Sequence, residues 1–409
     1  MTAWASLSLA AASALSAIFW ARTALRALAT DRLVDDLAEV APEPPPGGWP
    51  SVTAVVPARD EAASVERAVR SLLSQDYPDL AVVAVDDRSE DGTGEILDRL
   101  LAEAPARLHV VHVRALPEGW LGKNHACARG AEAAQGRYLL FTDGDVVFAP
   151  TALRRAVAYA EARGLGHLAA VPHLVAPGLL ERAFVATFAT FANLWMRPWE
   201  LRRPGTAGFV GVGAFALVLR EAYRKAGGHA SLRLEAVDDV KLGLVLRRSG
   251  VRQGVVRAGS LLSVRWAPGF CASWRGLLKN GFAAVEYRWP AALLACVSLA
   301  GLSVLPWVSL GLGAAPAKVL GLVSALLSSI VVGTTARRIS GGRGTEGLLL
   351  PVAGPALAAA LLASAAAASL RAHVTWRGTR YPLEALRRGC IRRRSLPAHR
   401  AVGWDPRWW

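Results

Sequence analysis

Two carboxylates stand one residue apart where an apolar run of the sequence ends. Residues 137–145 read Arg-Tyr-Leu-Leu-Phe-Thr-Asp-Gly-Asp, so Asp143 and Asp145 directly follow a segment with the composition of a buried strand. Proteins hold Mg²⁺ with one or two carboxylates while phosphate oxygens complete its shell. Open α/β sheets bind ligands at the carboxyl ends of their strands. An Asp-x-Asp also occurs in surface turns, but the preceding strand favours a site for Mg²⁺ or Mn²⁺ and a nucleoside diphosphate.

Two further acidic sites have the same placement. Residues 85–93, Val-Asp-Asp-Arg-Ser-Glu-Asp-Gly-Thr, carry an apolar run into two acids and a turn. Such an acid could accept the N–H of a uracil ring, or the segment could simply cap the next helix. Asp238 and Asp239 precede a predicted helix at 240–248. Acids there complement the helix dipole, whereas a general base must reach the hydroxyl that it deprotonates.

These acids lie within a region of alternating short apolar runs and amphipathic stretches, from about residue 44 to 265. The expected strands are 52–56, 80–85, 108–113 and 138–141, and the expected helices include 64–74 and 124–134. Strand–helix alternation predicts an α/β fold whose mostly parallel sheet has helices on both faces.

The composition argues against a purely soluble protein. Hydrophobic residues make up 53% of the 409 residues, and the formal net charge is +15. Nucleic-acid binding is one interpretation of that charge. The tail 371–409, however, holds ten arginines against Glu384 and Asp405, directly after an apolar segment. That arrangement favours anionic lipid as the partner and no nucleic acid. The four cysteines are far apart in sequence, which is typical of reduced, structural residues.

Four apolar stretches are long enough to cross a bilayer: 2–20, 289–317, 319–336 and 347–370. Arg22 and Arg26 follow the first stretch, so a retained anchor with its N-terminus outside is favoured over a cleaved signal peptide. Four full spans would then put the C-terminus outside, whereas the arginine-rich tail argues for inside. Either one C-terminal segment is re-entrant or interfacial, or the tail departs from the positive-inside tendency.

Taken in order, the motifs resemble those of family 2 glycosyltransferases, which have the GT-A fold. The segments that carry the resemblance are 55–61, 71–78, 85–93, Gly122-Lys123-Asn124, Asp-Gly-Asp, 215–229 and Asp-Asp-Val-Lys-Leu at 238–242. The similarity covers about residues 50–290. It is greatest to bacterial membrane-anchored members that glycosylate lipids, such as hopene-associated and carotenoid glycosyltransferases. Thr-Trp-Arg-Gly-Thr-Arg-Tyr at 375–381 fits that subgroup.

The resemblance implies roles for individual residues. The donor-binding residues that it implies are Pro57, Arg59, Glu61, Asp87, Lys123 and Asp143. Asp87 would contact uracil, Lys123 would lie near the phosphates, and Asp143 with Asp145 would hold Mg²⁺ or Mn²⁺. The catalytic residues that it implies are Asp239 as the general base, Asp238, Arg265 and Trp266.

The sequence departs from the family's pattern at two places. Leu262 stands where processive polymer synthases have the Gln of Gln-x-x-Arg-Trp, which argues against a polysaccharide synthase. Asp238 replaces a more usual Glu before the base. A processive or polyprenyl-phosphate-type enzyme remains an alternative, as does a catalytically dead membrane scaffold. A nucleotidyltransferase would favour a Gly-rich basic loop after the first strand, which residues 57–61 do not provide.

The expected protein is therefore a multi-pass enzyme of the cell (inner) membrane with a cytosolic catalytic domain. It would transfer a hexose, with inversion, from a nucleotide sugar, with UDP favoured, to a hydroxyl of a membrane lipid. The expected parts are an anchor at 1–22, a GT-A domain with interfacial helices at 44–288, about three membrane helices at 289–372 and an arginine-rich tail at 373–409. Aromatic residues at 184–199 would either fill a core or guide the lipid acceptor.

Overall fold

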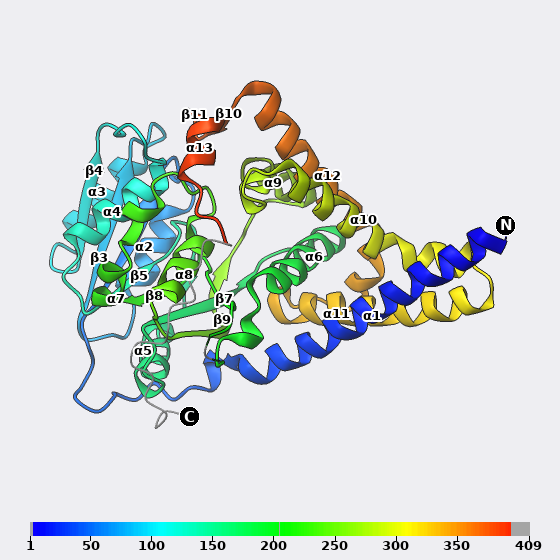
Figure 1. The fold of residues 1–409 in the computed structure, drawn as a ribbon. Helices are drawn as coiled ribbons and strands as arrows, with labels where there is room; N and C mark the ends of the chain where they lie inside the picture. The colour runs from blue at the N-terminus through cyan, green and yellow to red at the C-terminus, as the bar shows by residue number, and fades with distance from the viewer. Residues whose placement is uncertain (1–2, 204, 394–409) are drawn as a thin grey trace. The chain divides into compact units, whose positions relative to one another are not determined.

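The computed structural model describes residues 3–203 and 205–393 (Figure 1). The chain forms two compact units, each assembled from separate segments. One, here called the helical unit, comprises residues 1–33, 174–199 and 265–374. The other, the sheet unit, comprises residues 34–173, 200–264 and 375–409 as far as they are described. The division interleaves the units along the chain, whereas the sequence had suggested consecutive domains, and those domain boundaries stay a prediction.

The sheet unit is built on a nine-stranded mixed sheet with the order β1-β9-β7-β8-β5-β2-β3-β4, and β6 pairs with β9. Its strands are β1 (Asp35–Asp36), β2 (Val52–Ala58), β3 (Leu80–Asp87), β4 (Leu108–Val113), β5 (Tyr138–Phe141), β6 (Val147–Phe148), β7 (His167–Leu174), β8 (Ala216–Leu219) and β9 (Gln253–Val264). Strands β5, β2, β3 and β4 are mutually parallel, while β8 pairs antiparallel with both β5 and β7. The predicted α/β class with a mostly parallel sheet is confirmed.

The parallel strands bring two of the three predicted acidic sites toward one edge. Val55 of β2 pairs with Phe141 of β5, so the chain leaves both strands at nearly the same level. Asp86 and Asp87 lie in register with the last two residues of β4. Strand β3 is therefore two residues longer than its apolar run predicted, because pairing with β4 continues through the acids.

Helices cover both faces of this sheet. They are α2 (Val65–Leu73), α3 (Thr93–Glu103), α4 (Gly122–Ala133), α5 (Ala152–Ala162), α7 (Arg220–Lys225) and α8 (Asp238–Arg248). Ala54 and Val56 of β2 face one apolar cluster, which includes Leu97 of α3 and Val157 of α5. Val55, between them, faces the cluster formed with α4 and α8. Alternate residues of one buried strand thus meet two helical layers, as a central parallel strand requires.

The helical unit contains four helices that are long and apolar enough to cross a membrane. They are α1 (Ala3–Leu33), α10 (Trp289–Leu312), α11 (Ala315–Ser340) and α12 (Leu350–Arg371), with α6 (Leu179–Met196) and α9 (Phe270–Ala284) packed among them. The indole of Trp20 donates to the carbonyl oxygen of Leu302 at 3.1 Å, joining α1 to α10. Arg338 near the end of α11 pairs with Asp31 near the end of α1. These two helices therefore end at the same side of the unit.

The aromatic residues of α6 are partly core and partly surface. Phe184 is fully buried in a cluster with Leu277 of α9 and Leu361 of α12. Phe188 is only half-buried, and its ring centroid lies 5.1 Å from that of Trp266. Trp266 keeps 39% of its surface exposed. A core role holds for Phe184, while the Phe188–Trp266 pair leaves an aromatic surface on the helical unit.

Candidate active site

The turn after β5 (Tyr138–Phe141) holds the first two acids against the end of β2 (Val52–Ala58). Thr142 continues the strand and donates its hydroxyl to the carbonyl oxygen of Ala214 at 2.8 Å. Gly144 lies close to β2: a β-carbon placed there would meet the Pro57 carbonyl oxygen at 3.4 Å and Cγ of Glu61 at 3.9 Å. Asp143 and Asp145 therefore flank a turn packed against the donor residues that the sequence predicted after β2.

The electrostatics of this turn fit a divalent cation. Burial, together with the charges of Asp143 and Glu61, raises the pKa of Asp145 to about 6. Three carboxylates close enough to repel one another would be relieved by a cation with oxygen ligands, which Mg²⁺ and Mn²⁺ prefer. The donor set thus suits the predicted metal, and the roles of Asp143 and Asp145 as its ligands stay a prediction.

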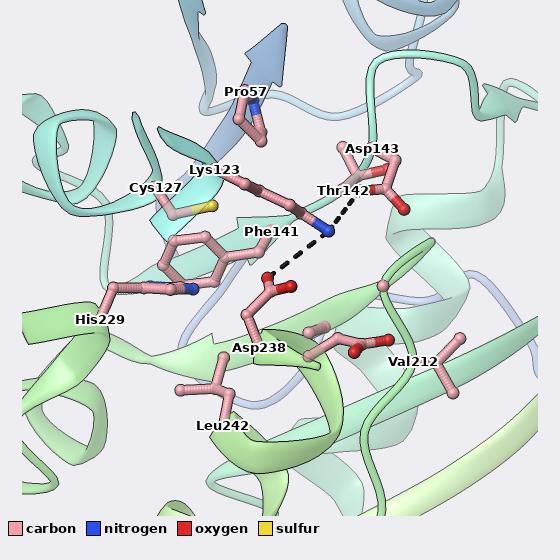
Figure 2. A pocket seen from close by; sticks show the side chains of 13 residues that line it. Pro57, Lys123, Cys127, Phe141, Thr142, Asp143, Val212, His229, Asp238 and Leu242 are labelled. Carbon is pink, nitrogen blue, oxygen red and sulfur yellow. Dashed lines mark ion pairs between the residues drawn. The ribbon is translucent and has the colours of Figure 1, made fainter. Parts of the chain in front are cut away.

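Lys123, in the first turn of α4, links two of the acidic sites. Its ammonium lies 2.8 Å from Oδ1 of Asp143 and 3.5 Å from Oδ2 of Asp238, as Figure 2 shows. Burial alone would lower the pKa of Lys123, but the charges of Asp143, Asp238 and Asp239 outweigh it and raise that pKa well above its usual range. Lys123 is therefore a permanently positive group at the centre of the site.

The two acids that open α8 have different surroundings. Asp238 is buried, and burial raises its pKa against the opposing charge of Lys123. Asp239 is half-buried and lines the same pocket. A β-carbon on Gly213 would lie 3.0 Å from Oδ2 of Asp143 and 3.1 Å from Oδ2 of Asp239. The predicted metal ligand and the predicted base thus face one point, beside a residue that has no side chain.

The sequence did not predict that the segment carrying Gly213 belongs to the site. This segment approaches α8 closely, and the approach depends on two other glycines. A β-carbon on Gly243 would lie 1.7 Å from the carbonyl oxygen of Val210, and one on Gly211 would lie 2.2 Å from that of Asp239. Glycines without neighbouring chemistry give no sequence signal, so only the folded chain reveals that this segment walls the pocket.

At the end of β3, Asp87 is buried and strongly paired. Both of its oxygens accept hydrogen bonds from Arg88, at 2.8 and 3.0 Å, and Arg59 lies 3.9 Å away. A carboxylate has about four lone-pair sites, so this pairing leaves capacity for one more donor. Arg88 was not predicted, although its position directly after Asp87 could have suggested it.

A second group of potential metal ligands lines the same pocket as Lys123. Side-chain atoms of Cys127, His229 and Asp238 all lie within 4.8 Å of one another, and all three residues are buried. Burial and the charge of Lys123 lower the pKa of His229 to about 3, and burial raises that of the Cys127 thiol. Sulfur and nitrogen ligands suit Zn²⁺ rather than Mg²⁺, so this group differs in chemistry from the carboxylates of the Asp143–Asp145 turn.

The two remaining predicted catalytic residues belong to the other compact unit. Arg265 and Trp266 follow β9 (Gln253–Val264) and are part of the helical unit. The sheet unit by itself brings together most of the other predicted residues. Pro57, Lys123, Asp143, Asp238 and Asp239 line one pocket, with Glu61 and Asp145 beside Gly144, while Arg59 and Asp87 lie outside the pocket lining. The catalytic roles of Arg265 and Trp266 stay predictions.

The sheet unit is an α/β domain of the GT-A type. It combines a mixed sheet that has acids at its carboxyl edge with a lysine at the start of one helix and an acidic pair at the start of another. Residues 53–227 match the model of the family described as "Glycosyl transferase family 2". This match agrees with the family that the motifs had predicted.

Curated relatives agree with this family. A 4,4'-diaponeurosporenoate glycosyltransferase from Staphylococcus aureus strain RF122 is 27% identical over 196 residues, which is 47% of this chain and 50% of the relative. The same enzyme from strain USA300 is 26% identical over the same extent. The match thus spans about half the length of the curated relatives. The predicted resemblance to carotenoid glycosyltransferases is confirmed.

Solved structures with a similar chain trace are more distant. A mannosyltransferase from Pyrobaculum calidifontis, in complex with GDP-Man and Mn²⁺, is 20% identical and has a TM-score of 0.49. The match covers 88% of this chain and 99% of the mannosyltransferase chain. The mannosyl-3-phosphoglycerate synthase from Rubrobacter xylanophilus is 19% identical and has a TM-score of 0.42. That match covers 64% of this chain and 81% of the synthase chain.

Proposed function

We propose that the protein is an inverting glycosyltransferase that moves a hexose from a nucleotide sugar to a hydroxyl of a membrane lipid. The observation that carries this proposal is the placement of Asp143 and Asp239, whose carboxylates face one point beside Gly213. Asp143 supplies charge there that could hold a diphosphate through a cation. Asp239 supplies a half-buried carboxylate that can take a proton. Single displacement with inversion requires a leaving group and a base on opposite sides of the reacting carbon.

The residues of the sheet unit have distinct tasks in this reaction. Asp239 accepts the proton of the acceptor hydroxyl as that oxygen attacks the anomeric carbon. Lys123 holds Asp238 and Asp143 in place and adds positive charge where the diphosphate leaves. A divalent cation on Asp143 and Asp145 would add further positive charge at the leaving diphosphate. General-base help supplies roughly 10²–10⁴-fold, so positioning and charge stabilisation account for the remaining acceleration.

We propose UDP as the nucleotide of the donor. Asp87 lies at the carboxyl end of β3, and its carboxylate retains acceptor capacity beyond the two bonds from Arg88. That capacity suits the N3–H of uracil. Arg59, close to Asp87, would then border the nucleoside, and Pro57 would border the sugar end of the pocket.

We propose a lipid as the acceptor because of features of the helical unit. Four helices could cross a membrane, and the exposed Trp266 with Phe188 offers an aromatic surface of the kind found at membrane interfaces. The S. aureus relatives are named for transfer to diaponeurosporenoate, which is a carotenoid acid. A Phe188→Ser variant should lose lipid transfer and keep slow donor hydrolysis by water.

We propose that the sheet unit is cytosolic, at the inner membrane. Leu33, at the end of α1, leads into the sheet unit, and the chain returns to that unit at Thr375. Both points must then lie on one side of the membrane. α10 and α11 account for one crossing out and one back, so α12 enters and leaves on the same side. This arrangement favours the re-entrant or interfacial alternative for a C-terminal segment.

The direct test is incubation of membranes containing the protein with labelled UDP-glucose, UDP-galactose and GDP-mannose, followed by lipid extraction. The proposal expects label in the lipid fraction from one donor. Gly213→Ala serves as the matched variant, because its added methyl fills the point between Asp143 and Asp239 and should abolish labelling. A labelled water-soluble polymer would replace the lipid acceptor by a polysaccharide. No label from any donor, with the protein folded, would favour a dead scaffold.

A further inference from the structure

The chain that follows the last apolar helix returns to the donor side of the site. β11 (Thr379–Pro382) and the turn at Arg377 and Gly378 belong to the sheet unit, although α12 precedes them. Arg377 donates to the carbonyl oxygen of Asp60 at 3.2 Å and forms an ion pair with Glu61. The turn therefore packs on the loop after β2, beside the acidic turn that carries Asp143 and Asp145.

Two further contacts hold the strand of this hairpin over the same region. Arg59 donates to the hydroxyl oxygen of Thr379 at 3.4 Å. The buried hydroxyl of Tyr381 accepts from the backbone N–H of Gly122 at 3.3 Å, and Tyr381 lies near Arg88. Each contact reaches a residue that belongs to, or directly adjoins, the predicted donor site: Arg59 itself, Arg88 next to Asp87, and Gly122 next to Lys123.

The residues that follow the hairpin are themselves held against the sheet unit. In α13 (Leu383–Gly389), Leu386 is almost fully buried. Ile391 then bonds through its backbone to both Glu235 and the buried Lys241 of α8. The segment from the turn to Ile391 thus runs from the loop after β2 to the helix that carries Asp239.

The turn itself has an unexpected residue. Arg377 has φ = 46° and Gly378 has φ = 75°, so both central residues of a two-residue hairpin turn are left-handed. Asn-Gly is the favoured pair for such a turn, because a residue with a β-carbon other than Asn or Asp is strained there. A strained arginine that reaches an active-site loop indicates that its side chain has a use beyond forming the turn.

We propose that Arg377 binds the diphosphate of the nucleotide donor and that the C-terminal hairpin is the outer wall of the donor site. This inference rests on the proposed function. The geometry places the guanidinium on Glu61, which adjoins the Asp143–Asp145 turn through Gly144. A guanidinium matches phosphate oxygens with paired donors as well as it matches a carboxylate. Arg377 can therefore exchange Glu61 for the diphosphate, or bridge the two.

The test uses Arg377→Asn in the full-length protein, because this change should preserve or improve the turn while it removes the guanidinium. Binding of UDP, GDP, uridine and guanosine is measured by calorimetry in the presence of Mn²⁺. Whichever diphosphate the wild type binds should bind the variant at least about tenfold more weakly, as expected for loss of a charge-assisted hydrogen bond. Binding of the matching nucleoside, which has no phosphate, should not change.

The matched control is Arg388→Asn, which removes an arginine from the same segment. Arg388 is largely exposed and pairs only weakly with Glu384, at 3.7 Å. Its removal should leave diphosphate binding intact. Unchanged diphosphate binding by Arg377→Asn would overturn the proposal, as would equal losses for diphosphate and nucleoside with a lower melting temperature. If the wild type bound neither UDP nor GDP, the proposed function itself would fail, and the hairpin proposal with it.

Discussion

The ammonium nitrogen of Lys123 lies 2.8 Å from a carboxylate oxygen of Asp143, so the first turn of α4 and the end of β5 are joined by an ion pair. The same ammonium lies 3.5 Å from Asp238 at the start of α8. One cation therefore balances acids from two elements that are far apart in the sequence. In this arrangement Lys123 organises the site before any ligand binds.

Replacing Lys123 by Met should separate these acids. The variant should lose about 1–3 kcal/mol of stability, because the buried Asp238 would lose its charged partner, and donor turnover should fall. Part of the stability should return with Mn²⁺, which can replace the missing positive charge. Thermal unfolding with and without Mn²⁺ measures both effects. Lys225→Met, which removes an exposed lysine of α7, is the control; equal melting temperatures for the two variants would contradict the role given to Lys123.

In the Asp145→Asn variant, the melting temperature should no longer depend on added divalent metal. Burial and neighbouring acids raise the pKa of Asp145 to about 6, so keeping this carboxylate ionised at neutral pH costs the folded state free energy that a bound cation would offset. The variant should therefore melt at the same or a higher temperature than the wild type in EDTA, but should gain no stability from Mg²⁺ or Mn²⁺. Calorimetric scans at pH 7.5 with each cation provide the measurement. A full metal-dependent increase in the variant would place the cation elsewhere, for instance at Cys127 and His229.

His112 should make part of the stability depend on pH. Hydrogen bonds to Asp86 and Asp98, at 3.0 and 2.9 Å, raise its pKa above the usual value. A raised histidine pKa stabilises the folded state fully below the unfolded pKa of about 6.5, and that stabilisation is lost as the pH rises through the folded value. The difference in melting temperature between wild type and His112→Gln should therefore be larger at pH 6 than at pH 8.5. A pH-independent difference would show that the ring acts by packing alone.

Thiol labelling in intact cells tests the proposed topology. In a background in which Cys271, Cys296 and Cys390 are replaced by serine and only the buried Cys127 remains, one cysteine at a time is introduced at three exposed positions: Pro46, Ala314 and Arg388. Pro46→Cys and Arg388→Cys should resist membrane-impermeant reagents until the cells are permeabilised, because both belong to the sheet unit. Ala314→Cys, between α10 and α11, should be labelled from outside. Labelling of Arg388→Cys in intact cells would make α12 a full span and would contradict the proposed path of the chain.

Local patterns predicted most of the sheet. The strands at 108–113 and 138–141 begin and end where their apolar runs do. The extension of β3 through Asp86 and Asp87 could not be read from the sequence, because acids are disfavoured in strands and pairing with β4 overrides that preference. Likewise, α8 begins at Asp238, two residues earlier than its apolar pattern indicated.

The site was predictable where its chemistry lies in side chains beside a strand end. Asp143, Asp239 and Lys123 come together as their motifs implied. Gly213 was not predictable, since its contribution is the absence of a side chain. Nor was the position of Arg377, which reaches Glu61 across 316 positions of sequence. Contacts of that kind depend on the path of the whole chain and leave no local pattern.

Asp239 is proposed as the base of a glycosyl transfer. Wild type and Asp239→Asn are compared in one experiment, in which UDP or GDP affinity and single-turnover hexose transfer to extracted lipid are measured together. If Asp239 is the base, the variant should bind the nucleotide with near-normal affinity and transfer the hexose at least about 10²-fold more slowly. Transfer at the wild-type rate, or a large loss of nucleotide affinity with the transfer step intact, would contradict that role.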